Sequence, residues 1–401
     1  MPERDEAMHR AESAFDPLVL DTNVDAHELY TRMRRECPVA HSDRFGGFWA
    51  VFGYEDVRRV LTEPDFITSV QNIVPKIAFT GRRPPLHLDP PEHTVYRRIL
   101  QPLISDARVS AIVPTIRRYA EDLLRPLVDR GHGDFGEEFA ANFPILAFAR
   151  FLNVSDEMMY RIRDEFDLFN GAIKDDDADR MVTASLALYD ITRELVAQRT
   201  EHPEDPSVDP TSALLAARVD GEPLPIEMVV GTVRQVLLVG IVAPRFVLGS
   251  MVVHLAQDQN LQGLLRREPG RIASAIEELL RLYSPYRGFA RTARSDVTIG
   301  DRLIKKDEPI AMVFTSANRD ERVFEAADEF RFDRAERHIA FGLGPHQCPG
   351  APWARMELLV ALETLLSMTT SFELAAPVDM TRWPEFGATS VPLRVVGAPS
   401  P

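Results

Sequence analysis

Cys348 lies in a glycine-rich loop that is suited to holding a reactive thiolate. Glycines at positions 342, 344 and 350 permit tight turns and a close approach of the backbone around the sulfur. A helix is predicted to begin directly after this loop, so helix N–H groups and the positive end of the dipole would favour thiolate over thiol. A thiolate is a strong electron donor to iron and promotes cleavage of an O–O bond. Taken alone, such a cysteine is more often an inert buried residue.

Two pairs of charged residues have a spacing that brings their side chains together. Glu278 and Arg281 are three residues apart in a predicted helix and therefore share a face. His93 and Arg97 are one helical turn apart, so both can face the same anion, and a bidentate arginine suits a carboxylate. Each pair taken alone is more often ordinary surface charge.

The cysteine segment resembles the heme-binding loop of the cytochrome P450 family. The run FGLGPHQCPG, from Phe341 to Gly350, matches the family pattern Phe-x-x-Gly-x-x-x-Cys-x-Gly at every fixed position. The resemblance implies heme b as the cofactor, Cys348 as the axial iron ligand, and backbone hydrogen bonds in the loop, which includes Gly350, that tune the sulfur. It also implies that Phe341 packs beside the heme and that His346 reaches a heme propionate.

Other segments carry the same resemblance, which extends from about residue 15 to residue 396. The run DPPEHTVYRR at 89–98 is similar to the segment leading into the family helix that crosses the heme edge, which implies that His93 and Arg97 bind propionates. Arg291 matches a further propionate-binding arginine of the family.

The Glu-x-x-Arg pair formed by Glu278 and Arg281 is also a family signature. In the family this pair forms a buried network with the segment before the cysteine loop. Arg334, in the run FRFDR, stands where the family supplies the third member of that network.

The long central helix departs from the family pattern. Most members carry an acid followed by a threonine that deliver protons to bound dioxygen, but Val242 and Ala243 occupy those positions here. Pro244 has no N–H to donate to the carbonyl of Gly240, so it should kink the helix and leave that carbonyl free to hold water. Gly240, Ala243 and Pro244 are therefore the candidate catalytic positions. A kinked packing helix without catalytic meaning is the alternative.

Two other functions remain open from the sequence. Some fatty-acid peroxygenases of the family use Arg-Pro in the distal helix, where the arginine holds the substrate carboxylate. Here the order is Pro244-Arg245, which turns Arg245 about 100° further round the helix and away from the heme. A non-catalytic heme sensor is the other alternative, although no signalling or DNA-binding segment is visible.

The predicted substrate pocket consists of small or apolar residues, which favours an apolar or aromatic substrate for hydroxylation or O-demethylation. Its candidate residues are Val239, Phe289, Ala290, Ala388 and Thr389. The loop from Ile67 to Leu86 is the predicted lid. No reductase domain is recognisable, so the resemblance implies a separate ferredoxin and ferredoxin reductase, or a flavodoxin, as electron donors.

Composition limits the partners and the compartment. The 401 residues carry a net charge of −15, which argues against binding to nucleic acid. Two cysteines provide no disulfide framework, and the N-terminus has no apolar core for a signal or anchor, so we expect a cytoplasmic protein. The apolar stretch 236–256 contains Pro244, Arg245 and His254, which favours a buried helix over a membrane span.

The elements that must position these residues are mostly helical. We expect one mainly α domain over 1–401, with an N-terminal extension of about residues 1–14 and a small β-rich region, in the triangular prism fold of the family. Helices are predicted at 54–61, 112–128 with a stop at Gly131, 225–257, 270–283 and 351–368, and a further one starting at Ser155. Strands are predicted at 48–52, within 297–314, at 372–374 and at 391–396, and a polar loop at 201–211.

Overall fold

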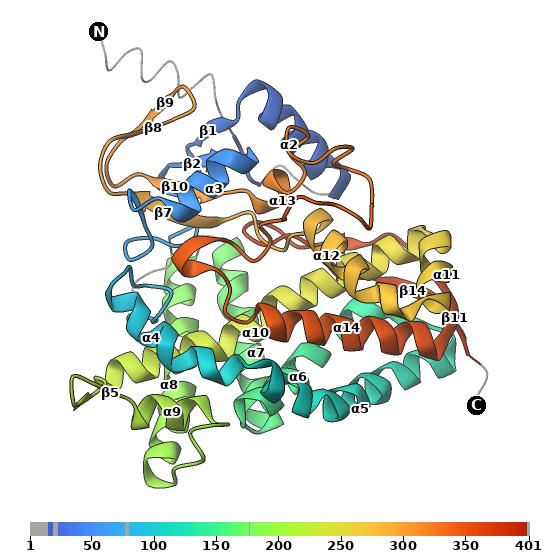
Figure 1. Ribbon diagram of the computed structural model, residues 1–401, viewed down its shortest axis with the longest axis horizontal. Helices are drawn as coiled ribbons and strands as arrows, with labels where there is room; N and C mark the ends of the chain where they lie inside the picture. The colour runs from blue at the N-terminus through green and yellow to red at the C-terminus, as the bar shows by residue number, and fades with distance from the viewer. Residues whose placement is uncertain (1–14, 19–22, 77–79, 176, 399–401) are drawn as a thin grey trace.

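Helices make up most of the molecule, and a smaller β-rich part lies against one side of them (Figure 1). The computed structural model describes residues 15–18, 23–76, 80–175 and 177–398. The mainly α class with a β-rich region near the N-terminus is therefore confirmed. The predicted extension of about residues 1–14 lies outside the described residues.

The α-helices are spread along the whole described chain. They are α2 (Asn23–Glu36), α3 (Tyr54–Thr62), α4 (Glu92–Leu100), α5 (Asp106–Arg130), α6 (Phe143–Leu152), α7 (Asp156–Lys174), α8 (Ala178–Glu201), α9 (Pro210–Ala216), α10 (Ile226–Gln257), α11 (Gln259–Arg267), α12 (Ile272–Leu282), α13 (Phe314–Ala317) and α14 (Ala351–Met368). A short 3-10 turn, η5 (Gly344–His346), precedes the cysteine.

The largest sheet joins two distant parts of the chain. Its strands are β1 (Val39–Ser42), β2 (Phe48–Val51), β10 (Pro309–Met312), β7 (Phe289–Ala293) and β3 (Phe66–Ile67), in that spatial order. β10 pairs with β2 in parallel, and the other neighbours are antiparallel. The smaller ladders contain β4 (His132–Asp134), β5 (Arg218–Val219), β6 (Glu222–Pro223), β8 (Val297–Ile299), β9 (Arg302–Ile304), β11 (Thr369–Leu374), β12 (Asp379–Met380), β13 (Ala388–Ser390) and β14 (Pro392–Gly397).

Most predicted helix ends agree with the structure. Ser155 caps α7 by accepting a hydrogen bond from the N–H of Met158, and Gly131 ends α5 in the left-handed conformation with φ of 75°. α5 begins at Asp106, earlier than predicted, because the polar first turn carries no apolar stripe. The polar loop is shorter than predicted, since α8 continues to Glu201 and Pro210 already opens α9.

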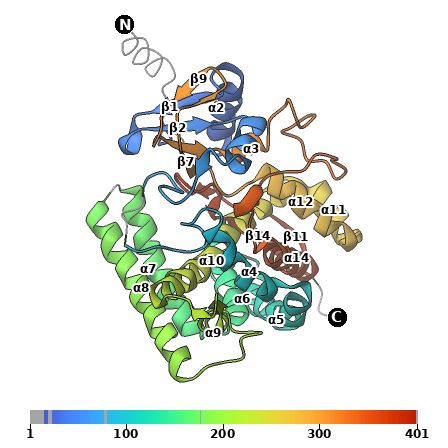
Figure 2. The same ribbon diagram turned by 60° about the vertical axis from the view of Figure 1, so that its left-hand side comes forward.

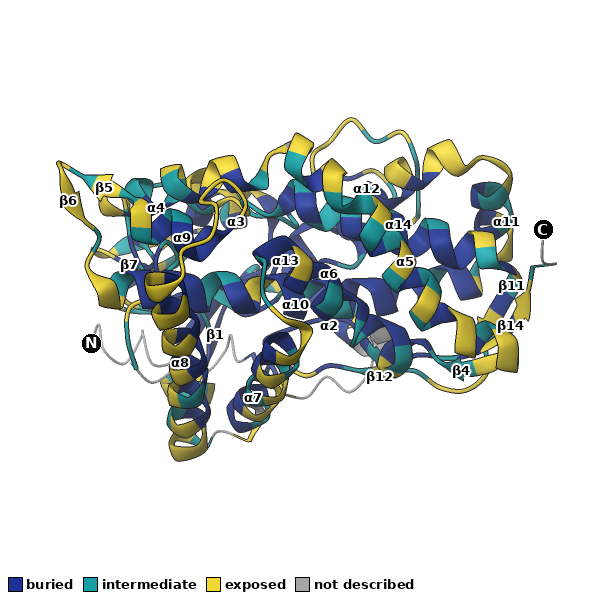
Figure 3. Ribbon diagram, turned by 90° about the horizontal axis from the view of Figure 1, so that it is seen from below, coloured by how far each residue is buried: buried dark blue, intermediate teal, exposed yellow. Residues whose placement is uncertain are grey.

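α10 is the central helix of the core. It is long and apolar enough to cross a membrane, but 67% of its most apolar window is buried inside the protein, as in the core helix of a soluble protein. Figure 3 shows its dark blue, buried ribbon at the centre of the molecule. The helix continues across Pro244 without interruption.

Gly231 sets the distance between α10 and the loop before α4. A Cβ atom placed on Gly231 would lie 1.9 Å from the carbonyl oxygen of Arg82, which belongs to the backbone and cannot rotate away. We expect Gly231→Ala to destabilise the protein by about 1–3 kcal/mol through overpacking. Gly171→Ala is the matched control, because that helical position is open within 4 Å and alanine is favoured in a helix. Urea unfolding of both variants measures this difference. Equal unfolding free energies would contradict the close contact between Gly231 and the backbone of Arg82.

Candidate active site

The loop before Cys348 is held in one shape by backbone contacts. Gly342 and Gly344 have φ of 67° and 69°, a region that side chains with a Cβ rarely adopt. A Cβ on Gly344 would also meet the carbonyl oxygen of Leu61 at 2.7 Å. The N–H of Cys348 donates to the carbonyl of Phe341 at 2.8 Å, which closes the loop over the sulfur.

Opposing effects act on the acidity of the Cys348 thiol. Desolvation by the surrounding protein raises its pKa, whereas a hydrogen bond from the N–H of Gly350 and the charges of Arg97 and Arg355 lower it. Cys348 is itself exposed, so the preference for thiolate stays a prediction for the protein alone. A bound metal ion would reverse the balance, since a coordinating thiol is deprotonated outright.

Four basic side chains from three segments meet beside this loop. His93 and Arg97 come from α4, Arg291 from β7, and His346 from η5. The rings of His93 and His346 are 4.3 Å apart, and Arg97 donates to the carbonyl of Gln347 at 2.8 Å. The structure thus brings together all four residues that the sequence assigned to the propionates.

This basic cluster has few anionic partners. Asp89 is the carboxylate whose charge acts on His93, His346 and Arg291, and its oxygens already accept hydrogen bonds from Thr68 and Ser69. Burial and then the neighbouring Arg291 lower the pKa of His346 to about 3, and burial lowers the pKa of Arg291 to about 10.

The cluster fits the two propionates of a heme. Both ring nitrogens of His93 are buried and have no hydrogen-bond partner among the described residues. A buried polar atom without a partner costs about 1–3 kcal/mol, so an acceptor is expected there. A group with two carboxylates beside the sulfur of Cys348 would supply acceptors to this histidine and compensate the positive charge.

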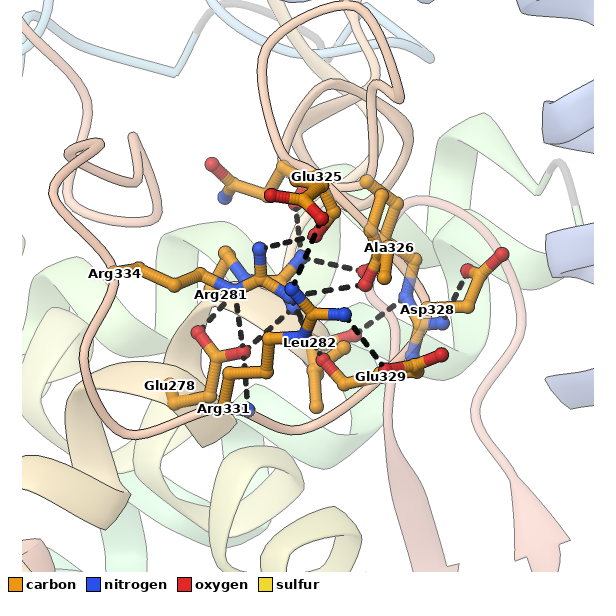
Figure 4. A network of polar contacts seen from close by, with 12 residues as sticks. Glu278, Arg281, Leu282, Glu325, Ala326, Asp328, Glu329, Arg331 and Arg334 are labelled. Carbon is orange, nitrogen blue, oxygen red and sulfur yellow. Dashed lines mark hydrogen bonds and ion pairs between the residues drawn. The ribbon is translucent and has the colours of Figure 1, made fainter.

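Figure 4 shows the charged network before the cysteine loop. Glu278 on α12 pairs with Arg281 at 2.8 Å and with Arg334 at 2.8 Å. Arg281 also donates to the carbonyls of Asn318 and Ala327. Burial alone would raise the pKa of Glu278, but hydrogen bonds from both arginines outweigh it and lower that pKa. The structure therefore contains the buried network that the sequence assigned to these three residues.

Sequence reasoning missed a second set of ion pairs formed by α12. Glu277 pairs with Arg355 of α14 at 2.6 Å and with His338 at 3.1 Å. The guanidinium of Arg355 lies over the ring of Phe341 at 4.6 Å. Adjacent acids on a helix point in different directions, so nothing in the spacing revealed that Glu277 binds the segments on both sides of Cys348.

Different faces of α10 meet different surroundings. Val239 is 51% exposed although the helix is mostly buried, and Ala243 lies one turn further along the same face. A Cβ on Gly240 would meet the ring of Phe148 at 2.3 Å, so the α-carbon of Gly240 packs against α6. The predicted distal face is therefore carried by Val239 and Ala243, and not by the Cα side of Gly240.

The next face of α10 borders a cavity of about 220 Å³ with a mixed polar and apolar lining. Val242 and Arg245 line it together with Asn170 of α7. Arg245 pairs with Glu137 at 3.4 Å and with Asp167 at 3.7 Å. Arg245 therefore points away from Val239, as its angle round the helix predicts.

The β7 strand separates two of the predicted pocket residues. Phe289 is half-buried, with its ring 4.2 Å from that of Tyr286, whereas Ala290 is fully buried in the core of the β-rich part. Successive side chains of a strand point to opposite faces, so Phe289 shares a face with Arg291 and Ala290 does not. The prediction for Ala290 is wrong for this reason. Tyr286, which the sequence did not single out, has its pKa raised by burial and then by the charges of Glu385 and Cys348.

The C-terminal turn meets α10 at other positions than predicted. Ala388 is buried and donates its N–H to Ser250 at 3.1 Å, about two turns beyond Ala243. Thr389 lines the cavity on the Val242 side of α10. The structure therefore does not bring Ala388 and Thr389 to Val239.

Comparison with known proteins identifies the family of this chain. Residues 135–394 match the family described as Cytochrome P450. Cytochrome P450 109 of Bacillus spizizenii is 31% identical over 380 residues, which cover 92% of this chain and 91% of that protein. Linalool 8-monooxygenase of Pseudomonas putida is 30% identical over 379 residues, which cover 89% and 92%.

Solved structures are similar over nearly the whole chain. Cytochrome P450 CYP109Q5 from Chondromyces apiculatus superimposes with a TM-score of 0.84 at 26% identity, covering 97% of this chain and all of that one. CYP109E1 from Bacillus megaterium in complex with testosterone gives a TM-score of 0.79 at 25% identity, covering 95% and 99%.

The buried network predicts a large loss of stability when its carboxylate is removed. Glu278→Gln leaves Arg281 and Arg334 buried without a counter-ion, so we expect a loss of about 3–5 kcal/mol. Glu363→Gln is the control, because its side chain is 30% exposed in a pair with Arg117 and should cost at most about 1 kcal/mol. Urea unfolding of both variants measures the difference. Similar losses of unfolding free energy in the two variants would contradict a special contribution of the buried network to stability.

Proposed function

Since this chain belongs to the cytochrome P450 family, we propose that it is a heme-thiolate monooxygenase acting on an apolar or aromatic small molecule. The reaction would be hydroxylation or O-demethylation, with one oxygen atom from O2 inserted into the substrate and the other leaving as water. The observation that carries this proposal is the meeting of Cys348 with four basic side chains around one space. The heme, when bound, would supply the reductive activation of dioxygen.

The residues around the loop would hold and tune that cofactor. The Sγ of Cys348 would bind iron and receive the hydrogen bond from the N–H of Gly350. The basic cluster would bind the propionates. Phe341 is fixed between the loop backbone and the guanidinium of Arg355, so its ring would stay beside the sulfur.

Proton delivery must use something other than the usual acid and threonine. The side chains of Val242 and Ala243 cannot carry a proton, and Pro244 has no N–H for the carbonyl of Gly240. We propose that water held on this carbonyl, or a polar group of the substrate, supplies protons on the distal side.

Electrons would come from separate proteins. The relatives are bacterial cytochromes P450, which supports a ferredoxin with its reductase, or a flavodoxin, as donors and a cytoplasmic location. The peroxygenase alternative depended on Arg245, which the structure pairs with Glu137 and Asp167 instead of offering it to a substrate. The sensor alternative differs from the monooxygenase in forming no oxygenated product.

Labelled dioxygen tests the proposed function. Candidate aromatics, terpenes, steroids, macrolides and fatty acids are first screened for a shift of the ferric heme from low to high spin. Those that bind are then incubated with isotopically labelled dioxygen, NADPH and a surrogate ferredoxin and reductase. We expect a product with one labelled oxygen atom. Unlabelled product formed from hydrogen peroxide alone would establish a peroxygenase. Absence of any product from ligands that shift the spin state would contradict an enzyme.

The role of Pro244 has its own test. Pro244→Ala restores a backbone N–H that binds the Gly240 carbonyl, so we expect water to be displaced and the fraction of NADPH converted into product to fall at least about threefold. Pro126→Ala, in α5 and outside the distal helix, is the control for removing a helical proline. Equal coupling of NADPH to product in Pro244→Ala and the unsubstituted protein would contradict the role of the carbonyl.

A further inference from the structure

Two buried arginines lie together between α8, α10 and the segment before α4. Arg234 of α10 is 1% exposed, and Arg83 of the predicted lid is 9% exposed. The guanidinium of Arg234 lies 4.7 Å from the ring centroid of Tyr189 on α8 and donates to the hydroxyl of Ser185 at 3.0 Å. Arg83 donates to Nε2 of His87 at 2.8 Å, which makes this histidine an acceptor and therefore neutral.

No carboxylate among the described residues lies within ion-pairing distance of either arginine. The nearby Glu227 pairs with Arg193 at 3.7 Å, and Glu92 with Arg82 at 3.8 Å. The Nε and Nη1 atoms of Arg234 are buried without a hydrogen-bond partner in the described part of the chain.

The other buried arginines of the described chain are compensated. Four of them pair with carboxylates: Arg34 with Glu321, Arg199 with Asp209, Arg281 with Glu278, and Arg319 with Asp328. Arg287 donates from each of its three nitrogens to an oxygen of the protein, and Arg291 belongs to the cluster assigned to the propionates. Arg83 and Arg234 are thus the exception, and both occur at one place.

Both guanidinium groups keep their charge in this environment. Burial is the main cause that lowers the pKa of Arg234 to about 9 and that of Arg83 to about 10, and the charge of Arg83 contributes to the shift of Arg234. Both groups therefore remain protonated at neutral pH. The same charges and burial lower the pKa of His87 to about 3. Uncompensated buried charge is costly, so an anion brought to this place would be bound strongly.

The pair lies beside α10 on another face than Val239. Arg234 precedes the exposed Val239 by five residues, which is about 7.5 Å along the helix axis and about 140° round it. α8 packs against α10 beside it (Figure 2). Two glycines allow the segment that carries Arg83 to lie directly on α8 and α10. A Cβ on Gly81 would collide with the side chain of Tyr189, and a Cβ on Gly231 would collide with the backbone of Arg82.

We propose that Arg83 and Arg234 bind a carboxylate of the substrate, whose apolar body extends from there round α10 to the distal face marked by Val239. This inference rests on the proposed function and narrows it from an apolar or aromatic molecule to an acid with an apolar body. Two guanidinium forks suit a planar carboxylate, which each can bind through paired N–H groups. The neutral Tyr189 and His87 beside them add no competing negative charge.

Iron-anchored probes test the pair without knowledge of the natural substrate. Imidazol-1-yl alkanoic acids of increasing chain length bind ferric heme through imidazole and extend the carboxylate into the distal side. The matching imidazol-1-yl alcohols are the uncharged controls. The dissociation constant of each probe is read from the change in the heme absorption spectrum of the holoprotein.

We expect acid to bind at least about tenfold more tightly than alcohol at the chain lengths that reach the arginines, which is about 1.4 kcal/mol. Arg234→Gln and Arg83→Gln should each reduce this preference to below about threefold. Arg193→Gln, an exposed arginine on α8, should retain it. If one of the two variants Arg234→Gln and Arg83→Gln does not fold, the other alone is enough for the test.

Two results would overturn the assignment of the carboxylate site. One is equal affinity for acid and alcohol at every chain length, and the other is a preference that survives in both arginine variants. These results leave the proposed function intact, because the imidazole still binds the iron. Failure of the ligand-free protein to show a thiolate-heme spectrum would instead contradict the proposed function.

Discussion

The pairing of Glu278 with Arg281 and Arg334 is the interaction on which the cysteine loop depends. It joins α12 to the segment that leads into the loop, and Arg281 extends it to the backbone carbonyls of Asn318 and Ala327. From Asn318 to Leu343 the chain has no regular strand or helix, so its shape is fixed by side-chain donors rather than by a ladder of backbone bonds. A buried carboxylate with two arginines therefore determines where the sulfur of Cys348 can lie.

Charge is distributed unevenly across the rest of the site. The chain carries a net charge of −15, yet the space beside Cys348 is bordered by four basic side chains. A second pair, Arg83 and Arg234, lies beside α10 without a carboxylate partner among the described residues. One basic group would meet the propionates of the cofactor and the other the carboxylate of a substrate. In this account the protein uses buried positive charge twice, once for the cofactor and once for the substrate.

Sequence reasoning succeeded where one segment alone determines the outcome. The start of α7 and the ends of α10 and α14 follow from local spacing and capping. The resemblance to the family grouped His93, Arg97, Arg291 and His346, and the structure brings these four residues together. Sequence reasoning failed where the outcome depends on which face of an element meets a distant one. Ala290 points into the β-rich core, Thr389 faces the cavity beside Val242, and Glu277 binds Arg355 across two helices.

The most direct test of the central claim is the absorption and electron paramagnetic resonance spectrum of the ferric protein in three forms. We predict that the unsubstituted protein binds one heme per chain with the signature of a thiolate ligand. Cys37→Ser should keep that signature, and Cys348→Ser should lose it. A thiolate spectrum that persists in Cys348→Ser, or a protein that binds no heme at all, would contradict the account.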